Sequence, residues 1–190
     1  LARSELDVEP PPIHETLVAA ADRFVVDRPT EDGHGKSIIA GYPWFADWGR
    51  DTMISIPGIC LATGRATIAR EILATFARFV DGGMIPNRFP GLGRPPEYNT
   101  ADAALLFIEA VGRTWIASGD EDASTANTFL RSLLPTIDEI LDAHRAGTRH
   151  GIRIDPADGL LDQGEAGLQL TWMDARIDGA VVTPRAGKAV

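Results

Sequence analysis

The sequence is short of cysteine and of positive charge, and each shortage excludes a class of protein. Cys60 is the one cysteine among 190 residues, so no internal disulfide can form. It lies in the apolar run 56–61 with no histidine nearby, which favours a buried structural thiol over a nucleophile. The net charge is −9 and the lysines and arginines are scattered, which argues against nucleic acid as a partner.

Long hydrophobic runs and targeting signals are also missing. No apolar stretch reaches the roughly 18 residues that a membrane-spanning helix needs, and no basic and apolar leader precedes the body of the chain. We therefore expect no membrane association and a cytoplasmic location. Apolar residues make up 44% of the sequence and charged residues 24%, which is typical of a globular domain with a core of its own.

Several motifs that carry chemistry in other proteins are absent as well. There is no Gly-x-Ser-x-Gly nucleophile elbow and no Gly-x-x-x-x-Gly-Lys phosphate loop. The acids Asp155, Asp158 and Asp162 do not have the spacing of a calcium-binding EF-hand loop, and the histidines show no paired zinc-ligand spacing. We expect neither a metal nor another cofactor.

Apolar residues at helical spacing predict five helices, and the fold class is therefore all-α. We expect Asp51 and Thr100 to cap the second and fourth helices, and Pro57 to kink the second. Residues 1–12 form a proline-rich linker or lead-in, residues 27–50 a loop, and residues 151–183 short strands or ordered loop. The expected helices cover residues 14–26, 51–63, 65–80, 100–118 and 124–146.

Long and short connections alternate between these helices. Loops of about 24, 16 and 38 residues fall at one end of the helical array, far above the usual length of about 4 to 6 residues. Long loops that share one end indicate a functional face. Antiparallel helical hairpins, closed into a toroid or open as a solenoid, produce this pattern, and the lack of a fixed-period repeat weighs against a simple solenoid.

The long loops carry flat rings and charged groups, as a sugar pocket requires. The run 41–51 holds two of the four tryptophans and one of the two tyrosines. Aromatic faces cover the C–H faces of a pyranose, while carboxylates and a guanidinium bind its hydroxyls. This run alone fits a hydrophobic plug equally well, and Asp51 and Asp102 fit helix caps equally well. The candidate substrate-binding residues are Trp44, Trp48, Arg50, Asp51, Asn87, Arg88, Tyr98, Asn99, Asp102, Glu165, Gln169, Trp172 and Arg185.

Asp174 is the candidate catalytic acid. It follows Trp172 and Met173, and partial desolvation by these side chains would raise its pKa from the usual value of about 3.9. A carboxyl group that keeps its proton can protonate a leaving oxygen. An inverting glycosidase needs a second carboxylate roughly 6.5 to 9.5 Å away. Spacing alone does not choose that partner among Asp51, Asp102 and Glu165.

Four motifs resemble those of one family and occur in its order. They are Gly41-Tyr-Pro-Trp-Phe-Ala-Asp-Trp-Gly-Arg-Asp-Thr52, Met84-Ile-Pro-Asn-Arg88, Tyr98-Asn-Thr-Ala-Asp102, and Gln169-Leu-Thr-Trp-Met-Asp-Ala175 with Val182-Thr-Pro-Arg185. The chain resembles the C-terminal amylo-α-1,6-glucosidase domain of glycogen debranching enzymes over about residues 12–190. Matches this long are not expected by chance.

The resemblance implies a fold, a reaction and roles for residues. The fold is an (α/α)6 toroid related to glucoamylases, and residues 13–190 would be its first part, with about five of twelve helices. The reaction is inverting hydrolysis of the α-1,6-linked glucose at branch points of glycogen or a branched α-glucan oligosaccharide. Asp174 is similar to the general acid, and Arg50 with Asp51 to the pair that holds the terminal glucose. The family's general base is a glutamate further on, so the 190 residues alone are expected to be truncated and inactive.

Two other functions remain open at this point. A broader exo-acting α-glucosidase of the glucoamylase type would use the same chemistry on other linkages. A carbohydrate-binding module would keep the groups that hold the sugar and lack catalysis.

Overall fold

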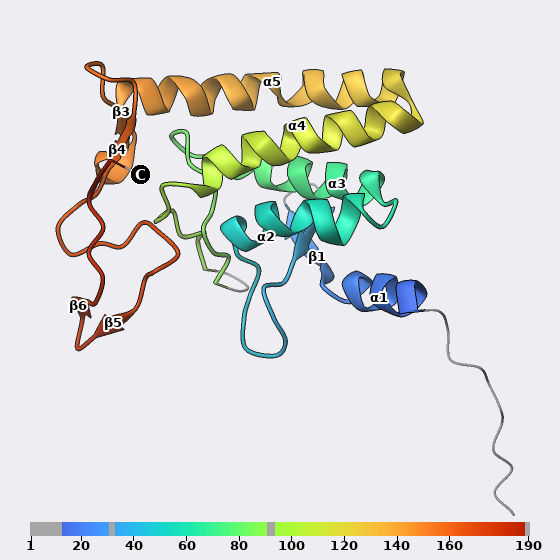
Figure 1. Ribbon diagram of the computed structural model, residues 1–190, viewed down its shortest axis with the longest axis horizontal. Coiled ribbons are helices and arrows are strands. Elements are labelled where there is room, and N and C mark those ends of the chain that lie inside the picture. The colour runs from blue at the N-terminus through green and yellow to red at the C-terminus, as the bar shows by residue number, and fades with distance from the viewer. Residues whose placement is uncertain (1–12, 31–32, 91–93, 189–190) are drawn as a thin grey trace, which may run out of the picture.

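The computed structural model describes residues 13–30, 33–90 and 94–188, so the lead-in expected at residues 1–12 lies outside the described residues. The described part contains five α-helices and several short strands, which confirms the expected helical fold class in part. In Figure 1, α4 and α5 lie side by side and run in opposite directions above α2 and α3. The α-helices are α1 Ile13–Asp22, α2 Gly49–Ile56, α3 Ala66–Ala77, α4 Ala103–Glu121 and α5 Ala123–Ala146.

One hydrophobic core joins α2, α3, α4 and α5. On α3, Ile72, Leu73 and Phe76 are fully buried, and they share one face because residues three and four apart lie together on a helix. Phe107 and Val111 of α4 contribute to the same cluster. The α-helix α2 ends at Ile56, and a π-helical turn, η1 Pro57–Leu61, follows it. The hydrogen-bond pattern changes at Pro57, where a kink was expected, while the backbone there stays helical.

Cys60 is fully buried in this core, as its apolar neighbours predicted. Burial raises the pKa of the Cys60 thiol to about 11. At pH 8 only about one folded molecule in a thousand then carries the reactive thiolate. We predict that a thiol reagent such as Ellman's reagent labels the native protein at least a hundredfold more slowly than the urea-unfolded protein. Equal rates in the two states would contradict the burial.

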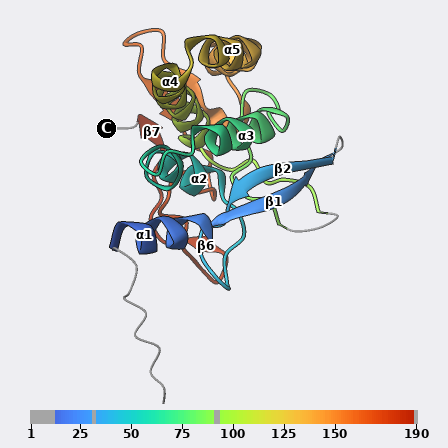
Figure 2. The same cartoon turned by 90° about the vertical axis from the view of Figure 1, so that its right-hand side faces the viewer.

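The strands β1 Val25–Thr30 and β2 Gly33–Ile38 form an antiparallel hairpin where a helix end and a loop were expected. The first helix ends at Asp22 and not near residue 26, because the β-branched pair Val25 and Val26 continues as a strand. Figure 2 shows the hairpin beside α3. The Lys36 backbone N–H donates to Thr75 Oγ1 at 3.0 Å, which ties β2 to that helix.

Two expected helix caps are wrong. The N-cap of α2 is Trp48, and Asp51 lies in the first turn of that helix without capping it. The N-cap of α4 is Asp102, without a side-chain cap bond, so Thr100 lies outside the helix. Both side chains are therefore free of the helix ends and can take other roles.

Short strands follow α5, as expected for residues 151–183. They are β3 Arg153–Ile154, β4 Leu161–Gln163, β5 Arg176–Ile177, β6 Ala180–Val181 and β7 Gly187–Lys188, together with a 3-10 turn η2 Arg149–Gly151. The order β3-β4-β7 makes one small antiparallel sheet, and β5 pairs with β6. Residues 184–188 end in β7, because Gly187 and Lys188 pair with β4.

Lys188 also fixes the turn that holds Asp155 and Asp158. Its ammonium lies 2.7 Å from Asp155 Oδ2 and also contacts Asp158. Each aspartate accepts a backbone N–H two residues further on, which is the ordinary behaviour of Asp in turns. The described residues contain no group of three or more potential ligands that could hold a metal ion. No helix among them is long and apolar enough to cross a membrane.

Candidate active site

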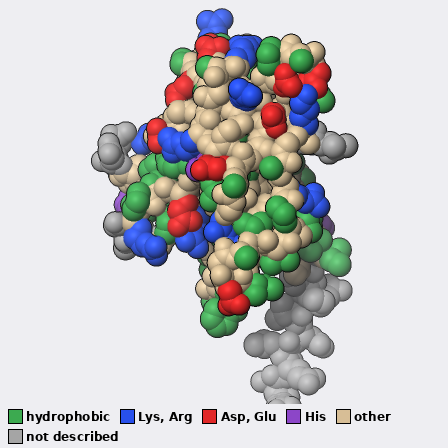
Figure 3. Space-filling model, turned by 90° about the vertical axis from the view of Figure 1, so that its left-hand side faces the viewer, with side chains coloured by type: hydrophobic (Ala, Val, Ile, Leu, Met, Phe, Trp, Pro, Cys, Tyr) green, Lys and Arg blue, Asp and Glu red, His purple; other side chains and the backbone are tan. Residues whose placement is uncertain are grey.

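Three loops meet where α2 and α4 begin. The Gly49 N–H donates to the Asn87 carbonyl at 2.9 Å, and the Ala101 N–H donates to the Leu170 carbonyl at 2.8 Å. Trp48 and Arg88 form an isolated β-bridge between the first two loops. In Figure 1 both helices begin at the end of the molecule where the segment after α5 lies, and Figure 3 views the molecule from that end. The loop clusters that the sequence placed on one face therefore do come together.

Gly49 makes the closest of these approaches possible. A Cβ atom at this position would lie 2.1 Å from the Pro86 carbonyl oxygen, a distance that no side chain tolerates. Because glycine lacks that atom, the first turn of α2 can pack directly on the loop that carries Asn87. This contact fixes the start of α2, and with it the two residues that follow, Arg50 and Asp51.

A pocket of about 300 Å³ opens at this junction. Asp51 and Asp174 are exposed, and neither carboxylate has a hydrogen bond or ion pair to any part of the chain that the structure describes. Flat rings and free carboxylates at one opening match the requirements of a sugar site. The lining residues are Ala40, Phe45, Trp48, Arg50, Asp51, Trp172 and Asp174.

Asp174 is more exposed than the sequence suggested. Trp172 is 68% exposed and Asp174 is itself exposed, so the structure does not show the burial that the sequence suggested for this acid. The backbone around the acid is nevertheless held. The Met173 N–H donates to Thr171 Oγ1 at 3.4 Å, and Thr183 Oγ1 donates to the Met173 carbonyl at 3.2 Å. The acid is thus presented on a braced loop that opens to solvent.

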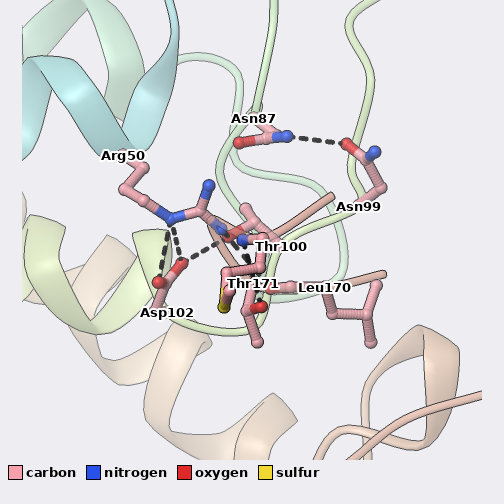
Figure 4. Close-up of polar contacts among 8 residues, drawn as sticks. Arg50, Asn87, Asn99, Thr100, Asp102, Leu170 and Thr171 are labelled. Carbon is pink, nitrogen blue, oxygen red and sulfur yellow. Dashed lines mark hydrogen bonds and ion pairs between the residues drawn. The ribbon is translucent and has the colours of Figure 1, made fainter. Parts of the chain in front are cut away.

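The Arg50 guanidinium lies at the centre of the junction (Figure 4). Its Nε donates to both oxygens of Asp102, at 2.9 and 2.8 Å. Its Nη2 donates to Thr100 Oγ1 at 2.8 Å and to the Leu170 carbonyl at 3.4 Å. One side chain thereby links the start of α2, the approach to α4 and the loop that carries Asp174.

Comparison with known proteins identifies the family. The family model described as amylo-alpha-1,6-glucosidase matches residues 19–190. The chain belongs to the amylo-alpha-1,6-glucosidase family. A glycogen debranching enzyme of Saccharomyces cerevisiae (strain ATCC 204508 / S288c) is 42% identical over 80 residues. That match covers 40% of this chain and 5% of the yeast protein, so the chain corresponds to a small part of that relative's length.

Four of the predicted site residues besides Asp174 line the pocket: Trp48, Arg50, Asp51 and Trp172. Asp102 does not line the pocket, but it pairs with the lining residue Arg50. Asn87 donates from Nδ2 to Asn99 Oδ1 at 3.0 Å, and Figure 4 shows this pair close to the guanidinium. Gln169 is buried beside Leu170, and neither atom of its amide has a hydrogen-bond partner among the described residues.

The other predicted residues have partners elsewhere or point to solvent. Trp44 is 85% exposed and is not part of the pocket lining. Tyr98 donates from its hydroxyl to the Phe79 carbonyl at 2.7 Å, and His150 Nδ1 lies 2.9 Å from Glu165 Oε2. Arg88 pairs with Glu97 at 2.8 Å, and Arg185 is exposed while its carbonyl accepts from Gln163. None of these five side chains lines the pocket.

The sequence interpretation missed one largely buried ion pair, which involves the aromatic loop, residues 41–51. Arg28 of β1 contacts both carboxylate oxygens of Asp47, and its guanidinium carbon lies 4.0 Å from the centre of the Phe89 ring. Asp47 lies in the aromatic run 41–51, yet its side chain is only 5% exposed. No sequence signal links the two residues, because the hairpin that carries Arg28 was itself not predicted.

Proposed function

We propose that this chain contributes the pocket of a glycoside hydrolase that removes α-1,6-linked glucose at the branch points of a glycogen-type α-glucan. The observation that carries the proposal is the meeting of two unpaired carboxylates, Asp51 and Asp174, with the rings of Trp48 and Trp172 at one pocket. Both acids belong to motifs that resemble those of the family. Glycogen or a branched α-glucan oligosaccharide is the partner that this chemistry fits.

In the proposed reaction, Asp174 donates its proton to the glycosidic oxygen as the bond from that oxygen to C1 of the glucose breaks. Water adds to C1 from the opposite face and gives its proton to a carboxylate base, so the configuration inverts. The resemblance assigns the base to a glutamate that follows the motifs matched here. Asp51 holds hydroxyls of the terminal glucose, and the two tryptophan rings cover its C–H faces.

The contacts of the other acids support this assignment. Asp102 is paired with Arg50, and Glu165 with His150, so each already has a partner. Asp174 and Asp51 are the acids of the pocket lining. Asp51 follows Arg50 on α2, where a helical turn fixes its direction, while Asp174 lies on the loop whose backbone is held at Met173.

The same proposal includes a fold. We propose that residues 13–190 form the first part of an (α/α)6 toroid, in which α2 and α4 are inner helices that begin at the mouth. The antiparallel pair of α4 and α5 and the gathering of loops at one end support this arrangement. A cytoplasmic location remains a prediction.

The decisive measurement is glucose release by the complete protein that contains this sequence. We expect release from an oligosaccharide that carries one α-1,6-linked glucose, and a much lower rate with maltose. A faster reaction with maltose than with isomaltose would favour an exo-acting α-glucosidase instead. Oligosaccharide binding in a calorimeter without any turnover would show a binding module and contradict the proposal.

Substitution of Asp51 tests the role of this pocket in holding the sugar. We predict that Asp51→Asn raises KM about tenfold and changes kcat less than about threefold, because the carboxylate binds hydroxyls alike in the ground and transition states. The matched control is Asp138→Asn, since Asp138 is an exposed acid on α5 far along the chain from the pocket motifs. An unchanged KM in Asp51→Asn would remove Asp51 from the sugar site.

A further inference from the structure

The resemblance implies that Arg50 holds the sugar directly, but its contacts point to an additional role. Arg50 is 7% exposed, and two of its three guanidinium nitrogens, Nε and Nη2, are engaged within the protein. The third guanidinium nitrogen of Arg50, Nη1, has no hydrogen bond to the described residues. The group can therefore offer the pocket one nitrogen at most, while the rest of the guanidinium acts inside the protein.

Thr100 closes the contacts around this guanidinium. Its hydroxyl oxygen accepts from Arg50 Nη2 at 2.8 Å, and the same hydroxyl donates to Asp102 Oδ1 at 2.5 Å. Thr100 is almost completely buried, and no helix-capping contact competes for it. The Thr100 hydroxyl thus accepts one hydrogen bond and donates another, so this buried polar group is satisfied.

The charge balance explains why Asp102 is required. A guanidinium keeps its proton under all ordinary conditions, so a buried arginine needs a carboxylate beside it. Asp102 supplies that charge, although its side chain is 41% exposed at the other edge. Because both of its oxygens accept from Arg50 Nε, the carboxylate is committed to the arginine and is poorly placed to bind a sugar.

The third contact of the guanidinium reaches the loop of the catalytic acid. The Leu170 carbonyl accepts from Arg50 Nη2 at 3.4 Å and from the Ala101 N–H at 2.8 Å. Asp174 lies four residues after Leu170, and Trp172 lies two residues after it. The backbone that leads to the acid is therefore held from both sides by the start of α2 and the approach to α4 (Figure 4).

From these contacts we propose that Thr100 and Asp102 are positioning residues for the reaction. They orient the Arg50 guanidinium, which in turn fixes the backbone at Leu170 and so the place of Asp174 against the leaving oxygen. Neither residue touches the sugar. The proposal rests on the proposed function, because it takes Asp174 as the proton donor.

The test uses two substrates that differ in their need for an acid. An α-1,6-glucosyl disaccharide requires protonation of its leaving oxygen, whereas α-glucosyl fluoride loses a stable anion without it. We expect Thr100→Val in the complete protein to lower kcat on the disaccharide about 10- to 30-fold, since misplacement by about 1 Å can cost a hundredfold. On the fluoride we expect a loss below about threefold, with KM nearly unchanged for both.

The control variant is Thr100→Ser, which keeps the hydroxyl, while valine keeps the branched shape and loses the hydroxyl. We expect Ser to restore at least half of the disaccharide activity. Asp102→Asn provides a second variant, because asparagine keeps the size and removes the charge, and it should show the same contrast between substrates. If Thr100→Val cannot be prepared in folded form, this second variant decides the matter.

Three results would overturn the inference. Equal losses on both substrates would indicate a general effect on the fold, and a main effect on KM would indicate direct sugar binding. Full activity of both variants on the disaccharide would exclude any role. Failure of the proposed function would be recognised separately, from the substrates that the wild-type protein cleaves. A wild type that cleaves maltose and not the α-1,6 disaccharide would contradict the proposed linkage, and the same two-substrate comparison would then be made with maltose.

Discussion

Replacement of Asp174 by asparagine is expected to lower kcat on an α-1,6-glucosyl substrate by about a thousandfold. General acid catalysis contributes roughly a hundred- to ten-thousandfold, and asparagine has no proton to transfer to the leaving oxygen. KM should change little, because the amide keeps the size and the hydrogen-bonding capacity of the carboxyl group. The measurement is the initial rate of glucose release by the complete protein at saturating substrate.

The same variant should be nearly normal on α-glucosyl fluoride, whose leaving group departs without a proton. This contrast separates loss of the acid from loss of the fold. The matched control is again Asp138→Asn, which removes an exposed acid on α5 and should leave both rates unchanged. Near-normal hydrolysis of the α-1,6 substrate by Asp174→Asn would exclude Asp174 as the acid.

Hydrophobic periodicity predicted the helices well, because it reports which face a helix buries. Ile72 and Phe76 lie on the expected face of α3, and the ends of this helix, expected at residues 65 and 80, lie at Ala66 and Ala77. The hairpin was missed for a physical reason. Its strands contain polar and exposed residues such as Asp27 and His34, so the alternation of buried and exposed positions is weak. The sequence Asp32-Gly33, at the point where the second strand begins, was the available signal.

The structure brings some of the predicted site residues to one pocket lining, and their roles stay predictions. Motif position was enough to place Trp48, Asp51, Trp172 and Asp174 together, because the loops that carry them meet where α2 and α4 begin. Whether a charged side chain faces the pocket or pairs with another side chain depends on contacts between residues that are far apart in the sequence. Arg50 lies 52 residues from Asp102 and 120 from Leu170, and no local pattern reports such a pairing.

The Arg28–Asp47 pair underlies the aromatic loop, and its removal is expected to have the largest effect on stability. Both side chains are largely buried, 19% and 5% exposed. Removal of one partner leaves a charge without compensation, which costs about 3 to 5 kcal/mol in buried pairs. We predict that Asp47→Ala lowers the free energy of unfolding by about 3 kcal/mol. Urea denaturation of the complete protein, followed by tryptophan fluorescence, provides the measurement.

Two comparisons show whether the buried charge is responsible. Arg28→Met combined with Asp47→Leu removes both charges, and it should recover most of the loss because no charge remains unpaired. Asp27→Asn breaks the exposed pair of Asp27 with Lys36, 2.7 Å apart on the same hairpin, and should have no measurable effect since solvent already screens it. If Asp47→Ala were as stable as Asp27→Asn, the pair would not hold the loop, and Phe45 and Trp48 would owe their places to other contacts.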